Sequence, residues 1–229
     1  MKIKLSPRLQ RIADYVLPGS TVIDVGTDHA YIPIWLLQNG ISASAYATDI
    51  RTGPLQRAAK DAEDAGVSNR LTLLLCDGLS ECPPDAVDTV IIAGMGGETM
   101  MGILSAAPWV LQKHLILQPQ TKYFELRAFL AENGYAIRDA SLVYDTGRIY
   151  RVWQIEAGEN TEKGWVEAPL VEKKDPLLRP YLEDMVKRLR KQIQGQERAV
   201  NSDAALLSAL HGELDEYLQL LEEAKTWQQ

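Results

Sequence analysis

The sequence has few of the residues that form disulfide bonds or hold structural metals. Its 229 residues include two cysteines, Cys76 and Cys82, and three histidines, His29, His114 and His211, which are scattered along the chain. Structural zinc sites use closely spaced pairs of such ligands, and disulfide-stabilised domains use several cysteines. We therefore expect neither a metal site nor a disulfide framework.

Long apolar runs are also missing. The longest stretches, such as TVIIAGMG and HLILQ, fall far short of the roughly 20 apolar residues that span a bilayer. The first ten residues, MKIKLSPRLQ, lack the hydrophobic centre of a signal peptide. These absences predict a cytoplasmic protein with no membrane partner.

Positive charge is scarce overall. The chain has 24 lysines and arginines against 31 acidic residues, and its net charge of -7 argues against a uniformly basic nucleic-acid-binding protein. Two runs concentrate the cations that are present: Lys2, Lys4, Arg8 and Arg11 in the first, and Lys187, Arg188, Arg190 and Lys191 in the second. Each run taken alone is typical of a solvated helix face.

The chain is rich in an alternation of short β-type runs and helical patterns. The strand candidates are 20–26, 44–50, 71–78, 88–94 and 114–120, and the amphipathic segments that follow strands are 30–39, 54–65, 97–106 and 123–133. Strands that are apolar throughout are covered on both faces. The alternation therefore predicts an α/β, Rossmann-like domain with a mostly parallel sheet.

Both ends of this predicted domain have their own signals. A helix is expected within the first sixteen residues, with Ser6 as its N-cap and Pro7 at its first position. The β-rich runs 135–145 and 148–157 are close enough to form an antiparallel hairpin at the edge of the sheet. We place the domain at 1–157.

The composition changes after residue 157. Residues 158–175 are rich in glycine, proline and charged residues, which is typical of a linker. In 176–229, apolar residues recur every three or four positions in two segments that flank 196–202. This pattern predicts an antiparallel coiled-coil hairpin.

Polar residues and glycines follow every predicted parallel strand, at the edge where open parallel sheets bind ligands. Gly26 lacks the two further glycines of a dinucleotide fingerprint, which argues against a nicotinamide cofactor. Asp49 is placed to accept hydrogen bonds from a ribose, and Asp77 and Gly78 are placed to bind an adenine ring. An adenosyl ligand without phosphate, such as S-adenosylmethionine, fits these positions. The candidate cofactor-binding residues are Asp24, Gly26, Thr27, Asp28, Asp49, Ile50, Asp77, Gly78, Ala93 and Gly94.

The motifs LSPRLQRIADYV, DVGTDHAYIP, DGL, IIAGMGG and LILQPQ occur in this order before the helical hairpin. This combination resembles the bacterial tRNA (adenine-22, N1)-methyltransferase family over the whole chain. The family resemblance implies a class I enzyme that uses S-adenosylmethionine and binds tRNA. Two positions depart from the family pattern: Gln120 replaces an asparagine, and Cys76 replaces a frequent glycine.

The resemblance also gives the polar turn after the first strand a chemical interpretation. Adenine N1 is already a nucleophile, so methyl transfer depends mainly on placement, and a carboxylate can stabilise the cation that forms. Asp28 is our candidate for that carboxylate, and glycines at 94–97 would leave room for an extruded adenine. The candidate catalytic residues are Asp28, His29, Gly94, Met95, Gly96 and Gly97. The candidate substrate-binding residues are Tyr31, Gln118, Pro119, Gln120, Lys187, Arg188, Arg190 and Lys191.

Other interpretations of the same features stay open. Asp28 is also suited to capping the helix that follows, and tight turns need glycines whether or not a ligand is present. The enzyme could methylate a small molecule, or the chain could be a non-catalytic RNA-binding protein with a methyltransferase-like fold. The hairpin could form a homodimer instead of holding tRNA.

Overall fold

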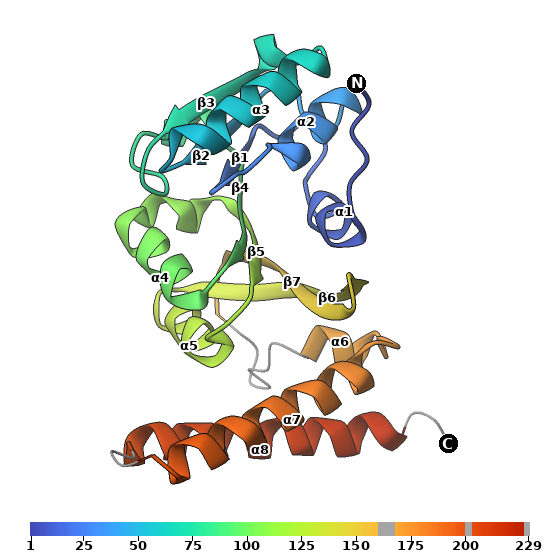
Figure 1. Ribbon diagram of the computed structural model, residues 1–229, viewed down its shortest axis with the longest axis vertical. Coiled ribbons are helices and arrows are strands. Elements are labelled where there is room, and N and C mark those ends of the chain that lie inside the picture. The colour runs from blue at the N-terminus through green and yellow to red at the C-terminus, as the bar shows by residue number, and fades with distance from the viewer. Residues whose placement is uncertain (160–167, 200–202, 227–229) are drawn as a thin grey trace. The chain divides into compact units, whose positions relative to one another are not determined.

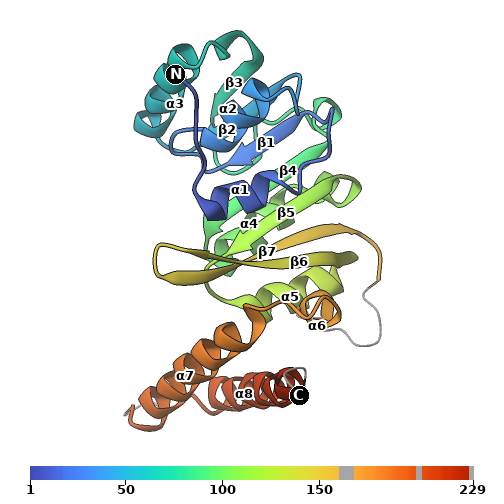
Figure 2. The ribbon, with the colours of Figure 1, turned by 90° about the vertical axis from the view of Figure 1, so that its right-hand side faces the viewer.

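The computed structural model describes residues 1–159, 168–199 and 203–226 (Figure 1). Contacts between residues divide the chain into two compact units, 1–166 and 167–229. The first unit is a sheet with helices on both faces, and the second unit is helical (Figure 2). Among the described residues, the helices are all too short or too polar to cross a membrane.

The first unit contains one seven-stranded sheet within its described residues. Its strands are β1 Val22–Val25, β2 Ala45–Asp49, β3 Leu71–Leu75, β4 Thr89–Met95, β5 His114–Pro119, β6 Tyr135–Asp145 and β7 Arg148–Ala157. Their order is β3-β2-β1-β4-β5-β7-β6. The first five strands are parallel, and β7 pairs antiparallel with both β5 and β6. The prediction of a mostly parallel Rossmann-like sheet with an antiparallel edge hairpin is confirmed.

The helices of this unit lie close to their predicted positions. They are α1 Pro7–Ala13, α2 Tyr31–Gln38, α3 Thr52–Asp64, α4 Gly97–Ala106 and α5 Tyr123–Glu132, with short 3-10 turns η1 Ser68–Arg70, η2 Pro84–Ala86 and η3 Pro108–Gln112. Helices α1, α2 and α3 cover one face of the sheet, and α4 and α5 cover the other (Figures 1 and 2). The central strands β1, β4 and β5 are mostly apolar because both of their faces are buried: Ile23, Ile91 and Ile116 have no exposed surface.

The direction of the chain connections changes between β1 and β4. Val22 of β1 lies opposite Ala45 on one side and Thr89 on the other. From β1 the chain proceeds outward through β2 and β3, and it then returns to β4 on the opposite side of β1. This is the switch point at which the carboxyl ends of parallel strands leave space for a ligand.

Helix α1 begins as predicted, with Ser6 as its N-cap and Pro7 in its first turn. The helix is shorter than the sixteen-residue segment suggested. The Ser6 hydroxyl donates a hydrogen bond of 2.7 Å to Asp145, and the backbone N–H of Arg8 donates one of 3.2 Å to the same carboxylate oxygen. These contacts fix the start of α1 to the end of β6.

The second unit contains α6 Ala168–Glu172, α7 Leu178–Glu197 and α8 Ala204–Lys225. Asp203 caps α8 by accepting hydrogen bonds from the backbone N–H groups of Ala205 and Leu206 at 2.9 and 3.0 Å. Residues 183–190 of α7 and 218–225 of α8 line a common groove, so the start of one helix lies beside the end of the other. The antiparallel helical pair expected from the sequence is present.

The segment predicted as a linker, 158–175, is not uniformly irregular. Residues 168–172 of this segment, with the sequence Ala-Pro-Leu-Val-Glu, form the short helix α6. Leu170 of this helix is buried. Residues 160–167 of the predicted linker lie outside the described residues.

Candidate active site

The turn after β1 has no room for a side chain at its glycine. Gly26 has φ +72°, and a Cβ atom there would lie 2.0 Å from Cε of Met95. Its backbone N–H and that of Thr27 both donate hydrogen bonds of 2.8 Å to the carbonyl oxygen of Thr48. The turn is therefore held against β2 by its hydrogen bonds and packs against the Met95 side chain at the end of β4.

Asp24 organises the same turn from inside. Its side chain is 8% exposed, and its carboxylate accepts a hydrogen bond of 2.7 Å from the Thr27 hydroxyl. The Thr27 oxygen in turn accepts one of 3.0 Å from the backbone N–H of Ala30, which has a left-handed φ of +51° just before α2. Burial raises the pKa of Asp24 to about 6, and the Thr27 hydrogen bond opposes that rise. This carboxyl group changes charge near neutral pH.

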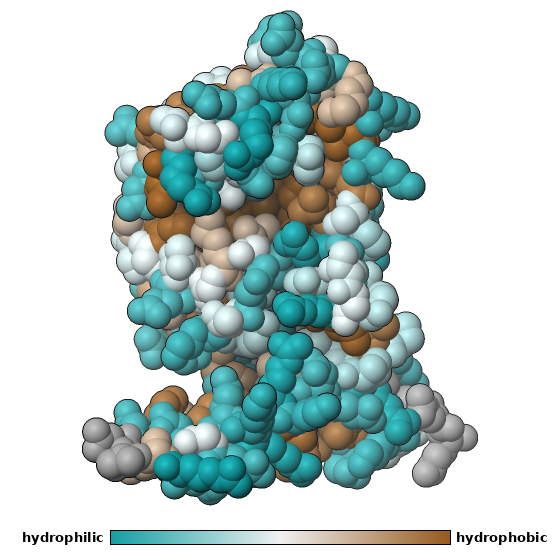
Figure 3. Space-filling view, viewed as in Figure 1, coloured by the Kyte–Doolittle hydropathy of each residue, from teal (hydrophilic) through white to brown (hydrophobic). Residues whose placement is uncertain are grey.

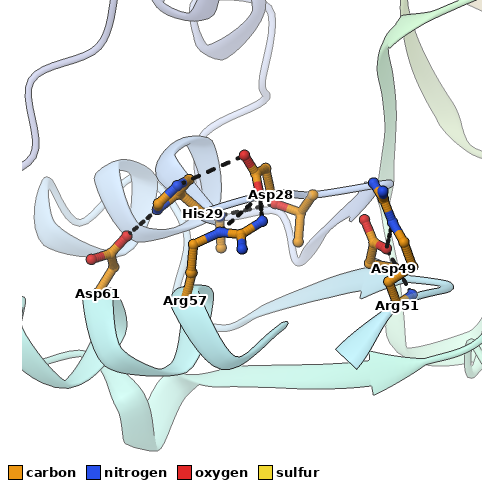
Figure 4. A network of polar contacts seen from close by, with 8 residues as sticks. Asp28, His29, Asp49, Arg51, Arg57 and Asp61 are labelled. Carbon is orange, nitrogen blue, oxygen red and sulfur yellow. Dashed lines mark hydrogen bonds and ion pairs between the residues drawn. The ribbon is translucent and has the colours of Figure 1, made fainter. Parts of the chain in front are cut away.

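Asp28 and His29 belong to a polar network with α3 (Figure 4). Asp28 pairs with the guanidinium of Arg57, whose Nε donates a hydrogen bond of 3.1 Å, and lies 3.7 Å from Nε2 of His29. The other ring nitrogen of His29 lies 2.7 Å from the Asp61 carboxylate. The hydrogen bond from Arg57 is the main cause of the lowered pKa of Asp28. Asp28 is 66% exposed, so it is a solvated, partnered carboxylate.

The ring of His29 stacks on Tyr31. Their centroids are 4.8 Å apart with an angle of 18° between the rings. Tyr31 is the first residue of α2 and remains partly exposed. The sequence predicted His29 as a catalytic residue and Tyr31 as a substrate-binding residue. The structure stacks their rings beside the turn after β1.

Asp49 closes β2 with a buried carboxylate that has spare hydrogen-bonding capacity. The residue is 7% exposed, and Oδ1 accepts a hydrogen bond of 2.8 Å from the backbone N–H of Arg51. The other oxygen has no hydrogen-bond partner among the described residues. The adjacent Ile50 is 66% exposed, and Leu75 at the end of β3 is 55% exposed. Figure 3 shows that hydrophobic residues also reach the surface elsewhere on the face of the sheet domain that it draws.

The end of β3 is tied to the end of β2. The Thr48 hydroxyl donates a hydrogen bond of 2.9 Å to the carbonyl oxygen of Gly78, and Cys76 N–H donates one of 3.1 Å to the carbonyl of Asp49. Gly78 has φ +56°, and a Cβ atom there would meet Ile103 at 3.1 Å. Asp77 is exposed at the same edge. The predicted ribose and adenine positions are therefore neighbours.

The glycines at the end of β4 and directly after it differ in how closely other atoms approach them. A Cβ atom on Gly97 would lie 2.7 and 2.8 Å from the carbonyl oxygens of Lys122 and Thr121, and one on Gly96 would lie 2.9 Å from the Thr121 hydroxyl. These two glycines are required by the close passage of the loop after β5. Gly94, with φ +76°, has no atom nearer than 3.7 Å to such a Cβ, and it interrupts the pairing of Ala93 and Met95 with β5.

Gln118 at the end of β5 is fully buried and does not face solvent. Its Oε1 accepts a hydrogen bond of 2.8 Å from Nη1 of Arg8, and its amide nitrogen donates one of 2.9 Å to the carbonyl of Pro119. Gln120 follows, and its backbone N–H donates a hydrogen bond of 2.9 Å to the carbonyl of Met95. Gln118 thus ties β5 to α1, and the backbone of Gln120 ties the loop after β5 to the end of β4.

Sequence reasoning missed three residues of this region: Arg8, Arg57 and Asp61. Arg57 and Asp61 are one turn apart on α3, and nothing in the local pattern distinguishes them from other solvated helix residues. Arg8 stood in a basic run, and that run was a signal for its charge but not for its contact with Gln118. Among the described residues, no group of three or more potential metal ligands is present.

The predicted basic run on α7 lies in the second unit. Arg188 forms an ion pair of 2.7 Å with Asp184, while Lys187, Arg190 and Lys191 have no ion pair among the described residues. Lys187 and Arg190 line the groove that α7 shares with α8. The run is therefore mostly available to an external anion.

Comparisons with known proteins agree with this geometry. A family model described as a methyltransferase domain matches residues 5–153. The Bacillus subtilis tRNA (adenine(22)-N(1))-methyltransferase is 34% identical over 160 residues, which are 69% of this chain and 67% of that protein.

Solved structures extend the similarity over nearly the whole chain. The crystal structure of the B. subtilis M1A22 tRNA methyltransferase TrmK has a TM-score of 0.78 at 27% identity and covers 98% of this chain and 99% of its own. The M. capricolum TrmK structure in complex with S-adenosyl-homocysteine has a TM-score of 0.76 at 26% identity, with coverage of 96% and 99%. The similarity includes the C-terminal helices as well as the sheet domain.

Proposed function

Because the chain belongs to the tRNA (adenine(22)-N(1))-methyltransferase family, we propose that it transfers the methyl group of S-adenosylmethionine to N1 of adenine 22 in tRNA. The observation that carries this proposal is the set of groups at the ends of β1, β2 and β3: a glycine turn, a buried carboxylate and a second glycine.

The residues present fit the cofactor. Gly26 has the left-handed φ of +72° that favours glycine, and the flexible Met95 side chain that lies over it would have to turn aside for a ligand to reach the backbone of this turn. The unused oxygen of Asp49 can accept a hydrogen bond from a ribose hydroxyl, while its partner oxygen stays on the Arg51 backbone. Exposed Ile50 offers an apolar contact to an adenine ring. Ionised Asp24 would attract the ammonium group of the amino-acid end of the ligand.

The reaction asks for little acid or base chemistry. The cofactor supplies an electrophilic methyl group bound to a sulfonium sulfur. In the transfer, the bond from carbon to sulfur breaks as the lone pair of adenine N1 forms the new bond to carbon, and no proton must leave N1. The chain therefore contributes placement. Gly94 presents no side chain beside Arg8 and Gln120, which favours the close approach of an adenine, and Asp28 adds negative charge, which Arg57 largely offsets.

The hairpin is the proposed site of tRNA attachment. Lys187, Arg190 and Lys191 are three cations without ion pairs among the described residues, so their charges can bind phosphates. Glu183 and Glu222 line the same groove as Lys187 and Arg190 and would compete with the phosphates there. The alternative in which the hairpin forms a homodimer stays a prediction, and light scattering of the purified protein at two concentrations would test it.

A single assay tests the function. The protein is incubated with unmodified tRNA and S-adenosylmethionine that carries a labelled methyl group, and the nucleosides of the digested tRNA are separated by mass spectrometry. We expect label in 1-methyladenosine, and none when the tRNA has guanine at position 22. Label in another nucleoside, or in no nucleoside while a small adenine-containing metabolite is methylated, would contradict the proposal.

A further inference from the structure

Arg8 extends from α1 to the carboxyl ends of the central strands. Its Nη1 donates a hydrogen bond of 2.8 Å to the buried oxygen of Gln118 on β5. Its guanidinium carbon lies 5.3 Å from the centre of the Tyr150 ring on β7. Asp145 holds the backbone N–H of Arg8 and so fixes the root of the side chain. Three elements therefore place this guanidinium in a defined position.

The charge of Arg8 is not compensated. It has no ion pair among the described residues, and both of its side-chain partners, Gln118 and Tyr150, are neutral. Arg51 and Arg57, at the same edge of the sheet, each have a carboxylate partner. A guanidinium has five N–H donors, and Gln118 uses one of them. A half-buried cation with spare donors favours an anionic ligand.

The guanidinium of Arg8 lies beside the backbone of Gly94. A Cβ atom on Gly94 would be 3.7 Å from Nη1 of Arg8 and 3.7 Å from the amide nitrogen of Gln120. The residue after Gly94, Met95, touches the Gly26 turn. An anion that approached Gly94 would therefore meet Arg8 on one side and the cofactor turn on the other.

We propose that Arg8 binds an oxyanion at the junction of the cofactor and acceptor sites, an inference that rests on the proposed methyl transfer to tRNA. Two oxyanions would reach this point: the carboxylate of the cofactor's methionine part, and a phosphate next to the target adenosine. Both accept paired hydrogen bonds from a guanidinium, and the planar fork of arginine suits both.

Three variants separate charge from structure. Arg8→Gln keeps an N–H donor for Gln118 and removes the charge, while Arg8→Lys keeps a positive charge without the fork. Arg11→Gln removes an exposed cation from the same helix and serves as the matched control. Thermal unfolding of each variant shows whether the fold is retained.

Two ligand arms distinguish the sources of the oxyanion. The first arm measures calorimetric affinity for S-adenosylhomocysteine and for methylthioadenosine, which lacks the amino-acid part. The second arm measures KM for tRNA at saturating cofactor. We expect Arg8→Gln to weaken one arm by about tenfold, Arg8→Lys to recover part of the loss, and Arg11→Gln to change neither arm.

The pattern of the losses identifies the ligand. A weaker affinity for S-adenosylhomocysteine with unchanged affinity for methylthioadenosine assigns the carboxylate, and a raised KM for tRNA with unchanged cofactor affinity assigns the phosphate. No change in either arm, an equal loss for both nucleosides, or a loss that accompanies unfolding and is not recovered by Arg8→Lys overturns the inference. If wild-type protein binds S-adenosylhomocysteine but methylates no tRNA, the proposed function fails while the first arm still tests Arg8.

Discussion

The ends of the sheet and the helical hairpin perform different tasks with different kinds of structure. At the strand ends, polar groups are buried or held by partners from distant parts of the sequence, as when Arg8 meets Gln118 or His29 meets Asp61. On α7, the useful cations are solvated and arise from one local run. Binding a methyl donor needs fixed geometry, whereas binding a polyanion needs only charge at a surface. The two regions should therefore respond to substitution in separable ways.

The largest effect that is confined to one region is expected from substitutions in the hairpin, which should weaken the affinity for tRNA. Replacing Lys187, Arg190 and Lys191 with glutamine removes the three cations without ion pairs. If each contacts one phosphate, the steepness of log affinity against log salt should fall by about 2.1 to 2.7, so the variant should lose about 20- to 40-fold less affinity than wild type between 50 and 200 mM salt. Filter binding over a salt series measures the slope.

Arg188 sharpens this test. Arg190→Gln should lower the slope by about 0.7 to 0.9, and Arg188→Gln should lower it less because Asp184 already offsets that charge. Affinity for S-adenosylhomocysteine should be unchanged in every hairpin variant. Superimposable salt lines for wild type and the triple variant would show that α7 is only a solvated surface.

Asp49→Ala should weaken cofactor binding and not tRNA binding, the opposite of the hairpin variants. It removes a buried carboxylate from the ribose position, which we expect to weaken S-adenosylhomocysteine by about 1–3 kcal/mol and to leave tRNA affinity unchanged. Calorimetry measures the first and filter binding the second. Asp85→Ala, an exposed aspartate in η2 before the start of β4, is the matched control. Equal cofactor affinity in the two variants would remove Asp49 from the site.

The close passage of Gly97 beside the loop after β5 predicts an effect on stability. Gly97→Ala would place a methyl group 2.7 Å from a backbone carbonyl that cannot rotate away, so we expect a loss of about 1–3 kcal/mol in the free energy of unfolding. Gly102→Ala, on the same helix with no atom within 4 Å of the added Cβ, should be neutral or stabilising. Urea unfolding of both variants measures the difference. Equal stability would show that the loop moves aside.

Asp24 predicts a pH dependence of cofactor binding. Because burial raises its pKa to about 6, the carboxyl is mostly ionised at pH 7.5 and mostly protonated at pH 5. If the ionised form attracts the ligand's ammonium group, affinity for S-adenosylhomocysteine should fall by about tenfold as the pH is lowered over this range. Asp24→Asn should bind more weakly at pH 7.5 and lose the dependence. A dependence that persists in Asp24→Asn would assign it to another group.

The sequence was most informative about features that depend on residues within a single helix or strand. Apolar runs and helical periodicity predicted the strands and helices of the sheet domain, and Ser6 with Pro7 predicted the start of α1. Residues placed by long-range contacts were beyond reach: neither Asp61 nor Arg57 has a local signal that pairs it with the β1 turn. Glycines were read as room for a ligand, but Gly96 and Gly97 are needed for the approach of Thr121 and Lys122. The sequence shows which residues are charged, but it does not show which distant residue each of them contacts.

Asp28 gives the smallest expected effect and the sharpest test of its predicted catalytic role. Asp28→Asn keeps the shape of the side chain and removes the charge. Because the carboxylate is exposed and paired with Arg57, its contribution should be that of a surface ion pair, about 0.2–1 kcal/mol. Turnover at saturating tRNA should then fall by less than about tenfold, with cofactor affinity and tRNA affinity unchanged.

Asp61→Asn, which weakens the contact that orients His29, is the matched variant on α3. Single-turnover rates of methyl transfer measure both. A loss of a hundredfold or more in Asp28→Asn would mean that bound substrate separates Asp28 from Arg57 and uses its full charge, and no loss at all would leave placement by the glycine turn and the strand ends as the source of catalysis.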